Sequence, residues 1–93
     1  MELPISRAFV RKLKEEPDNR RRAIWREVKS IPDRFFGTGK SARSAFKSLD
    51  KDVYIHVFSL PKAQASDSDA WFISFRYVKI WNQLRIADYG PLP

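Results

Sequence analysis

The chain has 93 residues, of which 43% are hydrophobic and 14% aromatic, and this composition predicts a folded protein with one modest core. It has no cysteine and a single histidine, so we expect neither a disulfide framework nor a metal or other cofactor. No apolar run has the length of a signal peptide or of a membrane span, which favours a soluble, cytoplasmic protein.

The net charge of +7 lies in the first half of the chain. Residues 1–51 hold 14 Lys and Arg against 7 Asp and Glu, whereas residues 52–93 hold 4 of each. A one-sided positive surface is typical of proteins that bind a polyanion, most often nucleic acid. An acidic protein partner would produce the same bias, and so would a surface that serves only solubility.

The first segments predict a short strand that leads into a helix. Residues 3–5 form the expected strand, and the proline within it suits only an edge position. Ser6 is a suitable N-cap for the helix, which carries Phe9 and Leu13 four positions apart on one side. Pro17 ends this helix.

A second helix is predicted over residues 19–31, with Asp18 as its cap and Pro32 as the residue that breaks it. Its apolar stripe consists of Ile24, Val28 and Ile31, widened by Trp25. Because the link between the two helices is very short, they should form an antiparallel helical hairpin.

The segment from residue 33 to 41 is expected to be a loop and contains "GTGKS". A Walker phosphate loop needs a glycine five positions before Gly39, where an arginine stands, so we reject that interpretation. Lys40 and the following helix start leave two alternatives, a contact to a single phosphate or a flexible loop with a helix cap. Residues 42–50 predict a third, short helix whose apolar face consists of Ala42, Ala45, Phe46 and Leu49.

From residue 53 the hydrophobic period changes from 3.6 to 2, which predicts three antiparallel strands. These strands are expected at residues 53–60, 71–80 and 83–89, with a polar loop at 61–70 and a tight turn near Asn82. A sheet covered on one face by helices buries both kinds of stripe, so the fold class is α+β, a helical hairpin on a small antiparallel sheet. We expect one domain over residues 1–93, mainly helical and basic over 1–51, a β-meander over 52–90 and an irregular tail in the last residues, 91–93, at the end of "GPLP".

Basic side chains on the second helix and in the segment after it predict a rim for phosphate contacts. Arg22 and Arg26 share one helical face, and contacts of this type ignore base sequence but depend strongly on salt. The alternative is a solvated helix face. The predicted nucleic-acid-binding residues are Arg20, Arg21, Arg22, Arg26, Lys40, Arg43 and Lys47, with Arg7, Arg11 and Lys14 nearby.

The last hairpin, "WFISFRYVKIWNQLRIADYG", carries arginines within an apolar pattern. A two-residue turn at Asn82 would place Arg76 opposite Tyr89, with Arg85 on the same face of the sheet. A three-residue turn would instead pair Arg76 with Asp88 in a cross-strand ion pair. Because a shift of one residue exchanges the faces, the sequence leaves both registers open.

In the first register, Arg76, Arg85, Tyr89 and the histidine at position 56 would gather on one open face as candidate catalytic residues. Such a group suits RNA, because aromatic and guanidinium planes stack on unpaired bases. In an RNA cleavage, the 2′-hydroxyl attacks its own phosphate, His56 or Tyr89 transfers protons, and the arginines stabilise the phosphoryl charge. The alternative for a lone histidine on a strand is packing without a chemical role.

The order of elements resembles the RelE/ParE superfamily of small bacterial toxins. The opening "LPISRAFVRKLKEE", the helical hairpin, the arginine in "FRYVKI" and the tyrosine in "ADYG" carry the resemblance. Ribosome-dependent members use basic residues with a late Tyr or His on mRNA, so the resemblance implies Arg76, Arg85 and Tyr89, together with Lys79, as site residues and an antitoxin as partner. Members of the ParE branch share this layout, lack the nuclease residues and act on DNA gyrase.

The sequence therefore predicts a small basic protein directed at RNA rather than DNA, a toxin-like endoribonuclease acting on mRNA. Two alternatives remain open. One is a non-enzymatic inhibitor, for example phage-encoded, that engages a host complex which handles nucleic acids. The other is a plain nucleic-acid-binding module, which needs only the basic helices.

Overall fold

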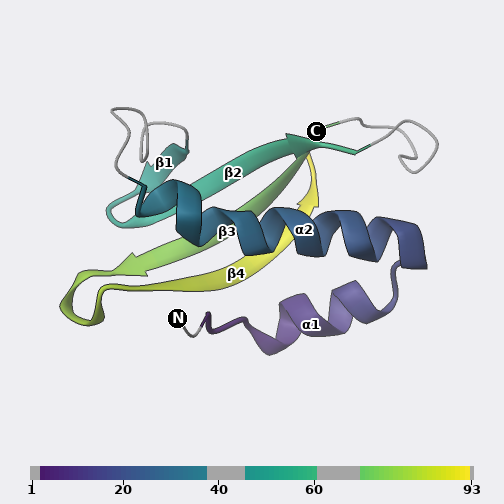
Figure 1. The fold of residues 1–93 in the computed structure, drawn as a ribbon, viewed down its shortest axis with the longest axis horizontal. Helices are drawn as coiled ribbons and strands as arrows, with labels where there is room; N and C mark the ends of the chain where they lie inside the picture. Colours follow the sequence, from purple (N-terminus) through teal and green to yellow (C-terminus); the bar gives the residue numbers. More distant parts are fainter. Residues whose placement is uncertain (1–2, 38–45, 61–69, 93) are drawn as a thin grey trace.

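The computed structural model describes residues 3–37, 46–60 and 70–92. Its elements are α1 (Arg7–Lys14), α2 (Asp18–Phe35), β1 (Lys47–Asp50), β2 (Val53–Ser59), β3 (Ala70–Val78), a 3-10 turn (Lys79–Trp81) and β4 (Gln83–Pro91). The strands form one antiparallel sheet in the order β1-β2-β3-β4, and both helices lie against the same face of it (Figure 1). The predicted α+β class, a helical hairpin on a small antiparallel sheet, is confirmed.

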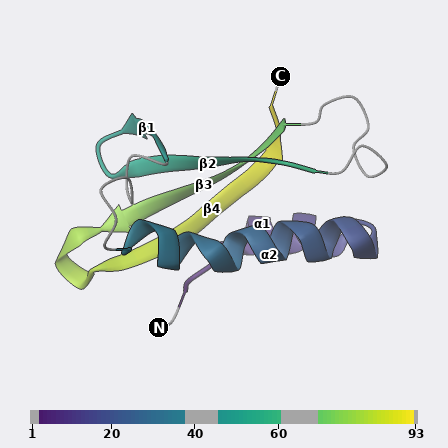
Figure 2. The ribbon, with the colours of Figure 1, turned by 45° about the horizontal axis from the view of Figure 1, so that its top comes forward.

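The two faces of the sheet differ because the side chains of each strand alternate. Residues at odd positions of β3, from Trp71 to Tyr77, are buried under the helices, as are His56 and Phe58 of β2. The helices contribute the buried side chains of their predicted stripes, Phe9, Leu13, Ile24, Val28 and Ile31. Phe35, which was expected in a loop, joins this core, whereas Trp25, which was expected to widen the stripe, is 38% exposed. No described helix covers the opposite face, which we call the open face (Figure 2).

Helix α1 begins where the sequence predicts. The Oγ of Ser6 accepts a hydrogen bond from the backbone N–H of Phe9 at 3.1 Å, which is the geometry of an N-cap. Just before the helix, Ile5 makes an isolated parallel bridge to Ile86, and the backbone N–H of Ser6 donates to the Ile86 carbonyl at 3.0 Å. The expected first strand is thus reduced to a single bridge along the outer edge of β4.

Two boundary predictions for the second helix are wrong. Asp18 is not its cap but its first residue, where its carboxylate pairs with arginines one turn later. Pro32 does not break the helix, which continues to Phe35. Because proline has no N–H, one hydrogen bond is missing in the last turn. Phe35, which is 1% exposed, holds that turn against the core through an aromatic cluster with Phe75 and four other rings. The expected loop therefore begins only after this turn.

The third helix predicted over residues 42–50 is also wrong where the structure describes it. Residues 47–50 form the edge strand β1, in which Lys47 pairs with Ile55 and Leu49 is 62% exposed. The four-residue apolar spacing was a coincidence, because only Phe46 of the described part turns into the core. Ala42 and Ala45 lie outside the described residues, as does the polar loop over residues 61–69.

Neither predicted register of the last hairpin occurs. The connection between β3 and β4 has four residues, with Asn82 in the left-handed region at φ 47°, so Arg76 stands directly opposite Arg85. Further along, Ser74 pairs with Asp88, and Ala87 is an extra residue that forms a bulge in β4. The strand also runs to Pro91, so the first residue of the expected irregular tail, 91–93, belongs to the sheet.

Candidate nucleic-acid interface

Arg76 and Arg85 project from the open face of the sheet as direct cross-strand neighbours. Both are exposed, and Val53 of β2 continues the same row across the sheet. Like charges directly opposite each other destabilise a sheet, so folding alone gives no reason for this pair. An anion placed between the two guanidinium groups would remove that repulsion.

Two open pockets flank this arginine pair. One, of about 460 Å³, is lined by both arginines together with the segment from Pro4 to Ser6 and the β4 residues Ile86 and Ala87. The other, of about 340 Å³, is lined by Arg76 together with Lys51, Asp52, Lys79 and Ile80. Arg76 therefore lines both hollows, with Arg85 in one and with two lysines and an aspartate in the other.

Lys79, which the family resemblance implies as a site residue, lies in the 3-10 turn at the end of this surface. Its Nζ is 3.7 Å from the Asp52 carboxylate, and its side chain is 65% exposed. An exposed pair at this distance is weak, so the ammonium group remains accessible to a second anion.

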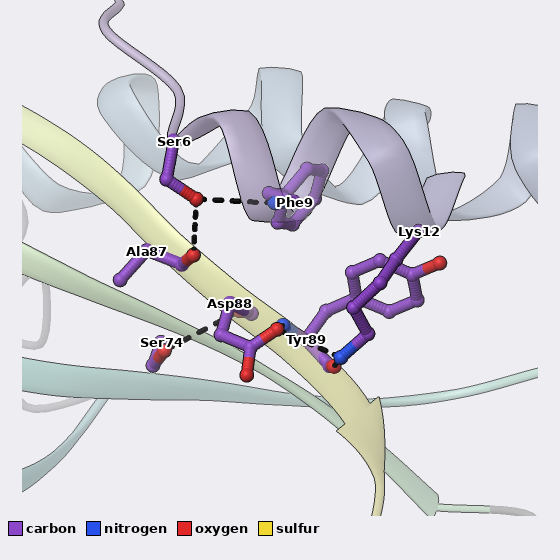
Figure 3. Close-up of polar contacts among 7 residues, drawn as sticks. All are labelled: Ser6, Phe9, Lys12, Ser74, Ala87, Asp88 and Tyr89. Atoms are coloured by element: carbon purple, nitrogen blue, oxygen red, sulfur yellow. Dashed lines mark hydrogen bonds and ion pairs between the residues drawn. The ribbon is translucent and has the colours of Figure 1, made fainter. Parts of the chain in front are cut away.

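Tyr89 lies on the other side of the sheet, packed against α1 (Figure 3). It is 2% exposed, its ring meets the edge of Phe9 at 4.8 Å between centroids, and the Lys12 Nζ lies 4.8 Å from its ring centroid. Simple alternation would place Tyr89 on the face of Arg85, but the extra residue Ala87 turns it over. The bulge therefore separates the tyrosine from the arginines.

The same burial changes the acidity of Tyr89. Burial, helped by the nearby carboxylates of Glu16 and Asp88, raises the pKa of its phenol to about 12. At neutral pH the hydroxyl is fully protonated and would be a poor base.

His56 is likewise on the covered face, opposite Ile73, and is 5% exposed. Its Nε2 lies 2.8 Å from the Oε1 of Glu27 on α2, and its ring packs between Phe46 and Phe58. This hydrogen bond joins the helical layer to the sheet. The face that was expected to gather all four candidate catalytic residues is therefore not formed, because β2 pairs with β3 in the register that turns His56 inward.

The basic residues of α2 are partly engaged with neighbouring acids. Arg21 and Arg22 both reach the carboxylate of Asp18, at 2.9 and 3.1 Å, and the hydrogen bond from Arg21 together with the charge of Arg22 lowers the Asp18 pKa. Arg20 is half-buried, 3.5 Å from a Glu16 oxygen and over the Trp71 ring.

The remaining predicted binding residues lie on different elements. Arg26 is exposed on α2, and Lys47 is exposed on β1. Because Lys47 pairs with Ile55, whose side chain lies on the open face, Lys47 belongs to the same surface as the arginine pair. Lys40 and Arg43 lie outside the described residues.

A second basic surface follows α1. Arg7, Arg11 and Lys14 line an open pocket of about 320 Å³ together with Ile5 and Val10. Ile5 also lines the pocket of Arg76 and Arg85, so the two basic surfaces meet at the N-terminal segment. Positive charge thus runs from the open face around the β4 edge onto α1.

Helix α1 is tied to the β4 edge by polar contacts (Figure 3). The Ser6 hydroxyl donates to the Ala87 carbonyl, and the Lys12 Nζ reaches both the Asp88 carboxylate at 2.8 Å and the Tyr89 carbonyl at 2.6 Å. Burial would raise the Asp88 pKa, but the hydrogen bonds from Lys12 and from the Tyr89 N–H outweigh it, so the pKa is lowered. These contacts satisfy edge carbonyls that would otherwise be open to another strand.

Trp81 is a residue of this surface that the sequence analysis missed. It is 63% exposed in the turn between β3 and β4, and the guanidinium carbon of Arg85 lies 5.1 Å from its ring centroid. The sequence does place a tryptophan directly before the turn residue Asn82. However, a large apolar residue at the end of a strand is ordinarily expected in the core, and only the folded hairpin shows that Trp81 is exposed.

Within the described ranges, no cluster of His, Asp or Glu could hold a metal ion, and no helix is long and apolar enough to cross a membrane.

No family model matches the sequence, and no curated protein matches it significantly. Solved structures that match in fold include the isolated E. coli RelE toxin, at 10% identity and a TM-score of 0.60, with 98% of this chain and 83% of that chain covered. The intact E. coli RelBE toxin–antitoxin complex contains a chain that matches at the same identity and TM-score, with 98% and 95% covered. The chain therefore has a RelE-like fold.

Proposed function

We propose that this chain is a toxin-like protein that acts on single-stranded RNA, with mRNA as its target, through the open face of its sheet. The observation that carries this proposal is the exposed cross-strand pair of Arg76 and Arg85, which line one pocket in a RelE-like fold. Guanidinium groups match the geometry of phosphate oxygens with two parallel hydrogen bonds. A phosphate between them removes the repulsion that the free pair carries.

In cleavage of the RNA, the two arginines supply the electrostatic stabilisation. The 2′-hydroxyl oxygen attacks the adjacent phosphorus and loses its proton, while the bond from phosphorus to the 5′-oxygen of the next nucleotide breaks and that oxygen gains a proton. The products are a 2′,3′-cyclic phosphate and a 5′-hydroxyl, and the guanidinium groups stabilise the negative charge that develops on the phosphoryl oxygens. Tyr89 and His56 face the helical layer, so neither is placed to transfer a proton at the open face. His56 acts instead as a packing residue that joins β2 to α2 through Glu27.

The proposed protein partner is an acidic antitoxin chain. The basic surface that runs from Arg76 and Arg85 to Arg7, Arg11 and Lys14 is complementary to such a chain. The E. coli RelE toxin, which shares the fold, forms a complex with an antitoxin. An antitoxin that covers this surface would compete with RNA for the same charges.

A second candidate function is a non-enzymatic inhibitor that grips a host complex which handles nucleic acids. The observation that favours it is that both proposed proton-transfer residues are buried on the covered face. A binding protein needs the basic open face but no acid or base on it.

Expression in cells and a binding assay together test the proposal. The wild-type chain is expected to arrest growth and cleave mRNA, and Arg76→Ala and Arg85→Ala should each relieve both effects. The matched control is Arg34→Ala, which removes an exposed arginine from α2. Growth arrest without RNA cleavage would favour the inhibitor, and the absence of both effects would refute the toxin.

Purified protein provides the second readout, the salt dependence of binding to single-stranded RNA. Loss of one phosphate contact should reduce the slope of log affinity against log salt by roughly 0.7. If neither arginine variant changes affinity or slope, the open face is not the RNA surface.

A further inference from the structure

The tip of the last hairpin exposes two consecutive large apolar side chains. Ile80 is 86% and Trp81 63% exposed, so most of each side chain faces solvent. A single exposed apolar residue needs no explanation, whereas adjacent ones beside a charged surface mark an interaction site. The tip lies at the end of the open face, next to Arg85.

This tip is held in a defined shape. Asn82 adopts the left-handed conformation, its Oδ1 accepts a hydrogen bond from the Tyr77 hydroxyl at 2.7 Å, and its N–H donates to the Lys79 carbonyl at 3.1 Å. The adjoining turn before β2 is tied to β3 by the Tyr77 N–H, which donates to the Asp52 carbonyl at 2.8 Å. Trp81 is therefore presented by an ordered turn rather than by a loose loop.

One face of the Trp81 ring lies against Arg85. The guanidinium carbon is 5.1 Å from the ring centroid, and the Arg85 Nε donates to the Gln83 Oε1 at 3.3 Å. A cation–π contact at an exposed site is worth only about 0.5–1 kcal/mol, so its main effect is to orient both groups. Trp81 is 63% exposed, and Arg85, which it contacts, stands directly opposite Arg76.

We propose that Trp81 is a stacking platform for an unpaired base of single-stranded RNA whose adjacent phosphate is held by Arg76 and Arg85. This inference rests on the proposed function and adds a contact to the base, because the arginines bind only the phosphate. An aromatic ring next to guanidinium groups is the combination that binds a base and its phosphate together. Cations at Arg76, Lys79 and Arg85 favour a nucleic acid over an apolar protein segment at this tip.

The test compares a fluorescein-labelled single-stranded oligoadenylate with an abasic ribose-phosphate strand of the same length. Trp81→Ala should weaken oligoadenylate binding by roughly 5- to 150-fold, weaken abasic binding much less, because that strand loses only the orientation of Arg85, and leave the salt slope unchanged. Trp81→Phe, which retains a smaller ring, should lie between the wild type and Trp81→Ala. The control is Trp25→Ala, which removes a tryptophan 38% exposed on α2 and should not change either affinity.

Failure of this inference can be told from failure of the proposed function. If Trp81→Ala binds oligoadenylate as tightly as the wild type while Arg76→Ala and Arg85→Ala weaken it, the platform is refuted and the RNA surface stands. An equal loss on the abasic strand would also refute stacking. If the wild-type chain binds neither strand, both proposals are wrong.

Discussion

Replacing Tyr89 with phenylalanine removes the oxygen that an acid or base would use and leaves the packed ring in place. The ring is 2% exposed, meets Phe9 edge-on at 4.8 Å and lies 6.4 Å from Trp71 in a stacked arrangement. No described residue accepts a hydrogen bond from its hydroxyl. We therefore expect Tyr89→Phe to change the free energy of unfolding by less than about 1 kcal/mol.

Removal of the ring has a much larger effect. Tyr89→Ala leaves a cavity between α1 and β4, and truncation of a buried aromatic residue costs about 3–5 kcal/mol. It also removes the ring beneath Lys12. Urea unfolding of the wild type and both variants at neutral pH measures these free energies, with Tyr54→Phe as the matched hydroxyl deletion on the same covered face.

The raised pKa of Tyr89 adds a pH dependence that only the hydroxyl can produce. The unfolded chain loses this proton near the ordinary value of 10.0, whereas the folded chain keeps it to about 12. The folded state of the wild type therefore loses stability as pH rises from 10 to 12, by up to about 3 kcal/mol relative to Tyr89→Phe. Other titrating groups are common to both proteins and cancel in this comparison.

RNA cleavage by the same variants decides whether Tyr89 is a structural or a chemical residue. If the wild type cleaves mRNA, Tyr89→Phe should cleave it at a similar rate. If this variant unfolds like the wild type but has lost cleavage, the hydroxyl takes part in the reaction, and the argument from burial is wrong.

Two further predictions concern the packing of the helices on the sheet. Asp88→Asn should destabilise the chain by less than about 1 kcal/mol at neutral pH, because the pair with Lys12 is about half exposed. The Asp88 pKa is lowered in the folded state, so the stability difference between the wild type and Asp88→Asn is present above pH 3.8 and should vanish as acid protonates the carboxylate. A stability difference that persists in acid would exclude the ion pair as its cause. Phe35→Ala should cost about 3–5 kcal/mol in urea unfolding, since Phe35 is 1% exposed and anchors the turn after Pro32; a loss below 1 kcal/mol would show that the aromatic cluster does not hold that turn.

Local patterns were sufficient for much of the fold. The change of hydrophobic period at residue 53, the N-cap at Ser6 and the buried positions of β3 all follow from neighbouring residues in the chain. Local rules failed at Pro32 and at residues 47–50. After Pro32, the buried aromatic cluster around Phe35 stabilises the last helical turn more than the proline destabilises it. At residues 47–50, hydrogen bonding to β2 makes the segment a strand despite its helix-like apolar spacing.

The site depended on long-range pairing and was predicted only in part. The sequence identified Arg76 and Arg85 as polar residues of an otherwise apolar hairpin, and they do share the open face. Tyr89 and His56 were expected beside them, yet both are buried. Trp81 was overlooked, because its exposure results from the turn that carries it.

By itself, the sequence determined the α+β class, the helical hairpin and the alternation of apolar and polar faces, because side-chain periodicity is a local property of the backbone. Only the tertiary structure decided which residues stand together. The four-residue connection at Asn82 placed Arg76 opposite Arg85, and the bulge at Ala87 turned Tyr89 to the helices. A bulge adds one residue to a strand, so every side chain beyond it points to the opposite face of the sheet. A single extra residue in β4 therefore decided that Tyr89 does not lie beside Arg76 and Arg85.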